Sequence, residues 1–192
     1  MADYNARIAP FINEVFYVTG AQPYYDDGTP HGGFDISTGT NSPVYSMTSG
    51  TVLYSEYNTG GYGNCIIIQD TQTGTAILYA HLRDLPLKSE GDSVALLEQI
   101  GIEGTTGTST GIHTHLEIQY NTLSTGWNWS IPYLDRPHVA DFLGIPNEYG
   151  ISAIYDGTPP TPPIPTVPHG KFKWVLYANK IRNRNNGNVK YM

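Results

Sequence analysis

Short apolar runs recur along the first two thirds of the chain, and turns rich in glycine and threonine separate them. Residues 63–70 (GNCIIIQD) and 75–82 (TAILYAHL) flank the turn TQTG, a pattern that predicts an antiparallel hairpin. Residues 43–57 (PVYSMTSGTVLYSEY) break at a Ser-Gly pair into two strand-like arms, and residues 113–120 (HTHLEIQY) predict a later strand. No long segment repeats its apolar positions at the period of a helix. The pattern therefore predicts an all-β fold made of successive hairpins.

The composition supports this fold class. A chain of 192 residues fits one domain of ordinary size, and its 14% of charged residues, 21 glycines, 15 tyrosines and 14 prolines are typical of short strands joined by many turns. The single cysteine, Cys65, excludes an intrachain disulfide framework and a multi-cysteine zinc site, and its apolar run predicts a buried position. A short helix is expected at residues 137–145, and the aromatic segment 126–137 either covers the core or lines a groove.

Charge divides the chain into two parts. The body carries a net charge of −13, whereas the six basic residues after residue 169 have no acidic neighbour and give the tail +6. Between the two parts, residues 158–168 hold six prolines and predict an extended polyproline II spacer. The sequence therefore predicts a domain over residues 1–157, a proline-rich linker over 158–169 and a basic tail over 170–192.

The sequence also excludes some classes of function. An acidic body argues against nucleic acid as the ligand, because phosphate binding depends on basic patches. The N-terminus MADYNARIAP lacks a basic segment followed by an apolar stretch, so no secretory signal peptide is expected. No run approaches the roughly 20 apolar residues of a membrane span. If the protein acts outside a cell, something else must carry or release it.

Histidines and one aspartate provide the candidate chemistry. Side chains two apart in a strand point to the same face, so His113 and His115 are expected to lie side by side. Upstream, the segment HGGFD places His31 and Asp35 four residues apart, and its two glycines let both side chains converge on one point. A third stretch, YAHL, adds His81. A catalytic zinc usually has three such ligands and one open position, so a metal site is predicted; packed or hydrogen-bonded histidines are the alternative.

The order of these segments resembles a known family, the lysostaphin-type (LytM-like) zinc endopeptidases of peptidoglycan. The resemblance covers residues 31–119 and rests on His-x3-Asp, Tyr-Ala-His-Leu and His-x-His in the family's order, with glycine-bearing phrases between them. It implies antiparallel sheets of the duplicated-hybrid-motif type, with long loops around a metal groove. The phrase EGDSVALLEQIG is also similar to the hammerhead sheets that carry biotin or lipoate, but it lacks their lysine at a hairpin tip.

The resemblance also implies the roles of the site residues. His31, Asp35 and His115 would bind a zinc ion (Zn²⁺), the expected cofactor, while His81 and His113 would flank its open position as catalytic residues. Water on the zinc would be the nucleophile, and the two histidines would move protons to and from it. Which histidine is the base and which the acid stays open. The choice of His115 over His113 as the ligand rests on the resemblance and not on spacing.

Three nearby positions depart from the family pattern or extend it. The residue between the last two histidines is Thr114 instead of a bulky apolar one, and it faces away from the ligands, so a packing change is expected. Some family members have a tyrosine before the first ligand that assists the oxyanion. Tyr25 is the match here, and Tyr24 is the alternative. Glu117 shares a face with His115 and is expected to support it rather than to act in catalysis.

The function implied by the resemblance is a zinc metalloendopeptidase that hydrolyses peptide bonds of the peptidoglycan stem or cross-bridge. Bacterial peptidoglycan is then the partner. The alternative is a catalytically degenerate LytM-like module that binds the wall or a partner protein, and the presence of all five site residues favours the enzyme. The choice of scissile bond depends on loop shape, so it is not readable from the sequence.

The setting in which the protein acts is a further prediction. A wall-degrading domain without a signal peptide suggests a phage lysin released at lysis or a virion-associated tail component, although a cloned fragment would look the same. The basic tail at residues 170–192 is a candidate contact for phage structural proteins, for the acidic body or for anionic wall polymers. A merely solvated tail is the alternative.

Overall fold

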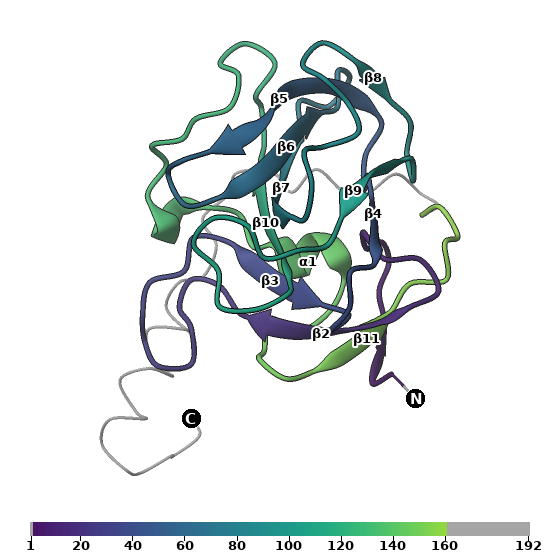
Figure 1. Ribbon diagram of the computed structural model, residues 1–192, viewed down its shortest axis with the longest axis vertical. Coiled ribbons are helices and arrows are strands. Elements are labelled where there is room, and N and C mark those ends of the chain that lie inside the picture. Colours follow the sequence, from purple (N-terminus) through teal and green to yellow (C-terminus); the bar gives the residue numbers. More distant parts are fainter. Residues whose placement is uncertain (1, 161–192) are drawn as a thin grey trace, which may run out of the picture.

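The computed structural model describes residues 2–160 and confirms the predicted all-β fold. Nine strands form one sheet in the order β1-β11-β2-β3-β10-β7-β6-β5-β8, and β4 and β9 form a second one (Figure 1). Within residues 2–160, no helix has the length and apolar character needed to cross a membrane. The elements are β1 (Tyr4–Asn5), β2 (Val15–Gly20), β3 (Phe34–Ser37), β4 (Pro43–Tyr45), β5 (Gly50–Asn58), β6 (Gly63–Gln69), β7 (Ala76–Leu82), β8 (Ser93–Val94), β9 (Gln99–Ile102), β10 (Thr114–Gln119), η1 (Tyr133–Asp135), α1 (Val139–Leu143) and β11 (Ser152–Ile154).

The central hairpin, β6 and β7, is the predicted one, and every residue of its two strands is buried. Both faces of the sheet are covered here, which explains the unbroken apolar runs. On one face the main core joins the sheet to Val44 of β4 and Ile100 of β9. On the other face lies a smaller apolar cluster, made of Cys65, Ile67, Ala76, Leu78 and Ala80. Because His115 pairs with Ala80 and Glu117 with Leu78, the histidine strand carries its polar side chains on the face of the smaller cluster.

The two arms in residues 43–57 do form strands, but the expectation that they belong to one hairpin is wrong. The first arm is β4, which pairs with β9, and the second is β5, which pairs with β6 and β8. The segment between them carries the chain from the small sheet to the large one. At this crossing the backbone N–H of Met47 donates to the buried hydroxyl of Tyr79, 2.7 Å away. An alternating pattern specifies which face of a strand is buried, not which strand lies next to it.

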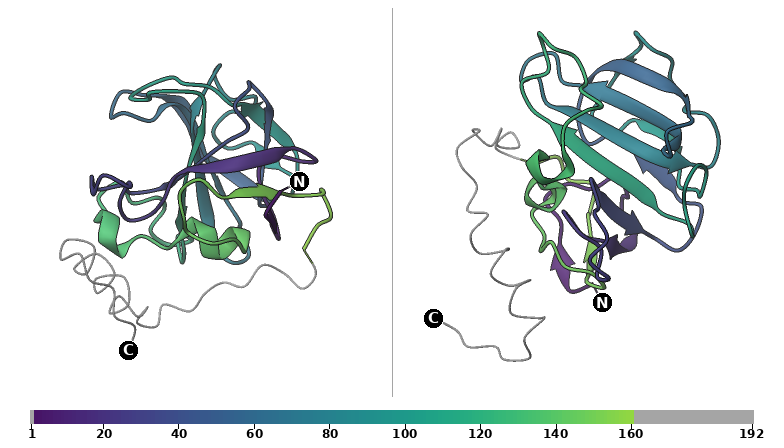
Figure 2. Two further views of the ribbon diagram at one scale, coloured as in Figure 1. Left: turned by 90° about the horizontal axis from the view of Figure 1, so that it is seen from below. Right: turned by 90° about the vertical axis from the view of Figure 1, so that its left-hand side faces the viewer.

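The two ends of the described chain pair with each other and extend the sheet. Strand β1 runs parallel to β11. Strand β11 is antiparallel to β2, beside which it lies in Figure 2, and β2 in turn pairs with β3. The predicted short helix is confirmed as α1, which ends at Gly144 in the left-handed conformation (φ 73°). The Arg7 guanidinium donates to the Asp141 and Phe142 carbonyls at the end of this helix. The strands of the N-terminal and C-terminal segments therefore both lie on the β2 side of β3, opposite β10.

A buried carboxylate, Glu103, directly follows β9. Its side chain is fully buried, and it accepts hydrogen bonds from the Thr38 N–H (3.2 Å) and the Thr38 hydroxyl (2.6 Å). Burial raises the pKa of Glu103 to about 7, the Thr38 hydrogen bonds oppose this shift, and nearby Glu14 adds to it. The folded protein therefore holds a proton on Glu103 that the unfolded chain releases near pH 4.5.

This site predicts a pH effect on stability. Between about pH 4.5 and 7 the folded state binds more protons than the unfolded state, so the contribution of Glu103 to stability decreases as the pH rises through this range. We expect Glu103→Gln to flatten this dependence and to raise the free energy of unfolding at pH 8 by about 1–3 kcal/mol. Urea unfolding at pH 5 and pH 8 measures it, with the exposed Glu90→Gln as the matched control. A variant that is no more stable than the wild type at pH 8 contradicts the prediction.

Two other sequence predictions concern burial and domain boundaries. Cys65 is fully buried in the smaller apolar cluster, as predicted, and this burial raises the pKa of its thiol to about 12. The proline-rich linker from residue 161 and the basic tail at 170–192 lie outside the described residues. The division into domain, linker and tail therefore stays a prediction.

Candidate metal centre

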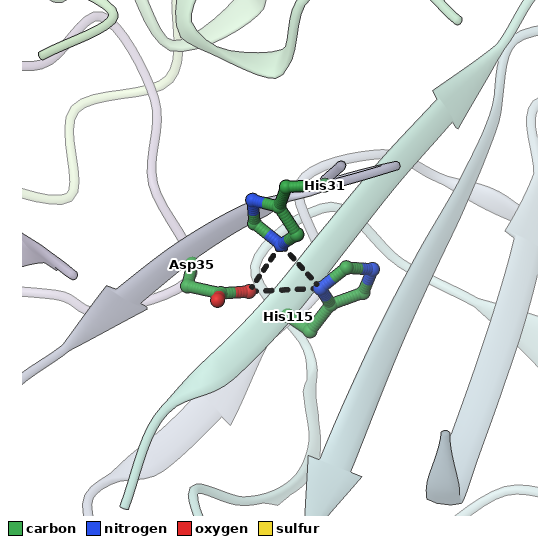
Figure 3. A group of neighbouring side chains, drawn as sticks. All are labelled: His31, Asp35 and His115. Atoms are coloured by element: carbon green, nitrogen blue, oxygen red, sulfur yellow. Dashed lines mark hydrogen bonds and ion pairs between the residues drawn. The ribbon is translucent and has the colours of Figure 1, made fainter. Parts of the chain in front are cut away.

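The structure brings His31, Asp35 and His115 together at one buried point (Figure 3). His31 lies in the loop that leads into β3, Asp35 is the second residue of β3, and His115 is the second residue of the neighbouring β10. His115 and Asp35 are direct partners in the register of the two strands. The His115 Nδ1 atom lies 2.8 Å from Asp35 Oδ1 and 3.2 Å from His31 Nε2, and the last two atoms are also 3.2 Å apart. Three potential ligand atoms therefore face one another.

This cluster fits a divalent cation such as zinc. Two imidazoles and one carboxylate form a ligand set that zinc accepts, and their facing atoms lie within 4.8 Å of one another. The outward nitrogen of each ring is also engaged, because His31 Nδ1 lies 2.8 Å from the Ala21 carbonyl and His115 Nε2 lies 3.2 Å from Glu117 Oε1. When these outward nitrogens carry the hydrogen, the inward nitrogens are free to bind metal. Their role as ligands stays a prediction at this point.

Burial and hydrogen bonding act in opposite directions on the charges of this cluster. Burial alone would raise the pKa of Asp35, but hydrogen bonds from His115 and His31 hold it well below its usual range. Burial would lower the pKa of His115, yet hydrogen bonds to Asp35 and Glu117 raise it to about 9. His115 thus holds a proton that competes with a cation for the same cluster. Metal binding is expected to release this proton and to weaken as the pH falls.

The other two predicted histidines flank the cluster. The rings of His81 and His113 are 4.7 Å apart, and His113 Nε2 lies 3.8 Å from Asp35 Oδ1. In both rings Nδ1 is held by a backbone carbonyl, that of Thr106 for His81 (2.8 Å) and that of Gly111 for His113 (2.9 Å). Burial, and then the neighbouring histidines, lower the pKa of His81 to about 4, so this ring is neutral near pH 7. His81 can therefore offer an unprotonated Nε2, and His113 directs its Nε2 toward Asp35.

Tyr25 reaches the cluster, whereas Tyr24 does not contact it in the described structure. The Tyr25 hydroxyl donates to Asp35 Oδ2 at 3.1 Å, and its ring stacks on His31 with 4.0 Å between the ring centroids. Tyr24 instead packs edge-on against Tyr133. A Cβ atom at Gly20 would lie 2.5 Å from Asp35 Oδ2 and 2.7 Å from the Tyr25 ring, so the close approach of these groups requires a glycine there. Of the two tyrosines, Tyr25 is the one placed to act on Asp35.

Glu117 lies directly behind His115, and a residue that the sequence did not reveal holds it there. Glu117 Oε1 accepts hydrogen bonds from the Tyr62 hydroxyl (2.8 Å) and from the guanidinium of Arg136. Arg136 follows η1 and is remote from β10 in sequence, so no spacing connects it with the histidine strand. Its position within the aromatic segment 126–137 gave no local signal. Glu117 is therefore a buried anion with three donors around it, one of them His115.

Part of the aromatic segment 126–137 covers a core, which is one of the two roles considered for it. Trp127 packs on the smaller apolar cluster and so covers a core. Trp129 is 40% exposed, and its ring centroid lies 5.4 Å from those of Tyr54 and Tyr62. The Tyr62 ring also lies edge-on to His115, with the ring centroids 5.8 Å apart. A series of ring contacts thus runs from Trp129 through Tyr62 to His115 of the metal cluster.

Comparison with known proteins relates the segment that carries this site to a family of peptidases. The family model described as "Peptidase family M23" matches residues 29–126. Over 91 residues the chain is 37% identical to the DD-carboxypeptidase/endopeptidase Mpg of Neisseria meningitidis, a match that covers 47% of this chain and 20% of that protein. The first curated relatives are all much longer than the matched segment, which spans less than a third of their length.

Two solved structures show the same fold. The catalytic domain of lysostaphin from Staphylococcus simulans superposes with a TM-score of 0.53 and 26% identity, over 69% of this chain and 92% of that domain. A zinc-containing peptidase from Vibrio cholerae superposes with a TM-score of 0.52 and 28% identity, over 61% of this chain and 36% of that one. The predicted resemblance and its antiparallel fold are confirmed by these matches.

Proposed function

The chain belongs to peptidase family M23, and from this premise we propose that it is a zinc-dependent endopeptidase that hydrolyses peptide bonds of bacterial peptidoglycan. The observation that carries the proposal is the convergence of His31, Asp35 and His115 on one buried point, with His81 and His113 beside it. The relatives include a DD-carboxypeptidase/endopeptidase and a protein named as a peptidoglycan DD-endopeptidase, and one similar solved structure is a zinc-containing peptidase, which supports both the substrate and the metal.

In this proposal His31 Nε2, Asp35 Oδ1 and His115 Nδ1 hold the zinc ion. Bound zinc supplies Lewis-acid chemistry, because it lowers the pKa of water and polarises the scissile carbonyl. The Ala21 carbonyl and the Glu117 carboxylate fix the two histidine rings from behind, so that their inward nitrogens stay aligned. The buried, negatively charged Asp35 partly neutralises the charge of the cation.

His81 and His113 move the protons of the reaction. One Nε2 accepts a proton from the attacking water, and the other ring delivers a proton to the leaving amine. The low pKa of His81, about 4, keeps this ring in its unprotonated form near pH 7. The rings face each other at 4.7 Å, so neither assignment of base and acid is favoured by distance.

Tyr25 holds Asp35 in the resting arrangement through its hydroxyl. Burial and the adjacent carboxylate raise the pKa of this hydroxyl well above its usual range, so it remains a donor at all physiological pH values. A donor at this place can also stabilise negative charge on the substrate oxygen if it turns away from Asp35. We therefore assign Tyr25 the positioning of Asp35, with assistance to the oxyanion as its second role.

The alternative, a degenerate module that only binds the wall, would not need a complete set of two assisting histidines beside three ligands. All five side chains are in place, which favours the enzyme. A role as a phage lysin or tail component stays a prediction that neither the site nor the similarities address.

The direct test is digestion of purified peptidoglycan with different cross-link chemistries, followed by mass spectrometry of the soluble fragments. We expect new amino termini at one class of peptide bond, no release after treatment with a strong chelator, and recovery when zinc is restored. Fragments with new sugar reducing ends, or lysis that a strong chelator leaves unchanged, would contradict the proposal. The identity of the fragments also gives the scissile bond.

A further inference from the structure

We infer that Arg136 is a positioning residue of the metal centre, which fixes the loop of His31 and the carboxylate behind His115 at the same time. The inference rests on the proposed zinc site and adds a residue to it. Arg136 lies beyond residue 126, where the match to the family ends. The contacts of its side chain, and not any similarity, therefore carry the inference.

One guanidinium makes three directed contacts. Its Nε donates to the Ile131 carbonyl at 3.1 Å, which orients the group within its own loop. Its Nη1 donates to the Gly32 carbonyl at 3.4 Å and to Glu117 Oε1. The side chain is only 12% exposed, so water screens these contacts weakly. Arg136 thus connects the aromatic loop with both sides of the metal cluster.

Both inner contacts reach groups next to a proposed ligand. Gly32 directly follows His31, so the hydrogen bond to its carbonyl restrains the loop that carries this imidazole. Glu117 Oε1 accepts from His115 Nε2 at 3.2 Å, so the Arg136–Glu117 ion pair determines where the carboxylate holds the second imidazole. Groups that orient metal-binding histidines in this way typically contribute about 10–100-fold to metal affinity.

Gly32 gives independent support, because the Arg136 guanidinium occupies the position where a side chain at residue 32 would begin. A Cβ atom built at Gly32 would lie 2.6 Å from Nη1 and 3.0 Å from Cζ of Arg136, and these are its nearest contacts. The backbone of Gly32 is not in the left-handed region, so alanine is acceptable there apart from this clash. The glycine is therefore needed for the guanidinium to approach the His31 loop.

A second arginine, which lies between β1 and β2, provides a structural control. Arg7 donates to the Asp141 and Phe142 carbonyls and fastens α1, but it makes no contact with the metal cluster. Removing its side chain should weaken the fold of the same region and leave the ligands in place. A loss of metal affinity that follows from general destabilisation would therefore appear in Arg7→Met as well as in Arg136→Met.

The experiment measures zinc affinity of the metal-free protein by competition with a chromophoric chelator, together with urea unfolding. We expect Arg136→Met to weaken zinc binding about 10–100-fold, while Arg7→Met lowers the urea midpoint and keeps the wild-type zinc affinity. Arg136→Lys should recover little, because a single ammonium group cannot donate along the three directions of the guanidinium. Gly32→Ala should weaken zinc binding in the wild type and add little in the Arg136→Met background.

Zinc affinity in Arg136→Met that equals the wild-type value would overturn the inference. So would an equal loss of affinity in Arg7→Met, because the effect would then reflect general stability. Neither measurement uses wall hydrolysis. A wild-type protein that binds zinc tightly and cuts no peptide would refute the proposed function. The effect of Arg136 on zinc affinity could still be measured in that protein.

Discussion

His115→Ala is expected to weaken zinc binding and to slow wall hydrolysis, each by at least about 1,000-fold. The side chain contributes one of the three inward ligand atoms, at 2.8 Å from Asp35 Oδ1 and 3.2 Å from His31 Nε2. Its loss leaves two protein ligands, fewer than the three that hold a catalytic zinc, and it leaves Asp35 and Glu117 buried without their shared imidazole. Elemental analysis of the purified protein measures the zinc content, and fragment release from walls measures hydrolysis.

The matched control for this change is His138→Ala. His138 precedes α1 and lies outside the metal cluster, so the variant should keep one zinc per chain. If His115→Ala also retained one tightly bound zinc, the assignment of the ligands would be wrong.

The second large effect separates catalysis from metal binding. His113→Ala is expected to keep zinc at the wild-type level and to reduce turnover about 100- to 10,000-fold, because general acid–base catalysis typically contributes this much. The His113 ring faces His81 at 4.7 Å, and its Nε2 lies farther from Asp35 than the ligand nitrogens do, at 3.8 Å. The bell-shaped dependence of kcat on pH should also lose the ionisation on one of its two sides.

Zinc content and kcat measured on the same sample decide this prediction. Loss of zinc in His113→Ala would make this residue a ligand instead of a proton-transfer group. Turnover at the wild-type level would remove it from the mechanism. Since His113 and His115 are two apart on one strand, the pair of variants distinguishes two roles that spacing alone leaves equivalent.

Much of the fold was predictable where local pattern determines structure. The β6–β7 hairpin followed from two buried runs around a four-residue turn, and α1 followed from a short apolar segment that ends in glycine. The separation of β4 from β5 was not predictable in this way. The sequence of a strand determines which of its faces is buried, whereas the strand that pairs with it depends on the packing of the whole sheet.

The site shows the same division. The approach of His31 and Asp35 followed from a histidine, two glycines and an aspartate in one short segment, and the shared face of His113 and His115 followed from strand geometry. Arg136 could not be found, because its contacts to Gly32 and Glu117 join segments 104 and 19 residues apart through side chains of a loop. No periodicity connects such positions. Only the fold brings them together.

The pairing of β1, β11 and β2 sets a practical limit on how far the protein can be shortened. A fragment cut to residues 29–126 would lack β2, which flanks the strand of Asp35, and it would lose Tyr25 and Arg136 as well. The uncovered edge of β3 would offer free N–H and C=O groups to any other extended chain, a common starting point for aggregation. Recombinant fragments designed from the family boundaries alone would therefore be prone to self-associate, and an inactive preparation of that kind would say little about the enzyme.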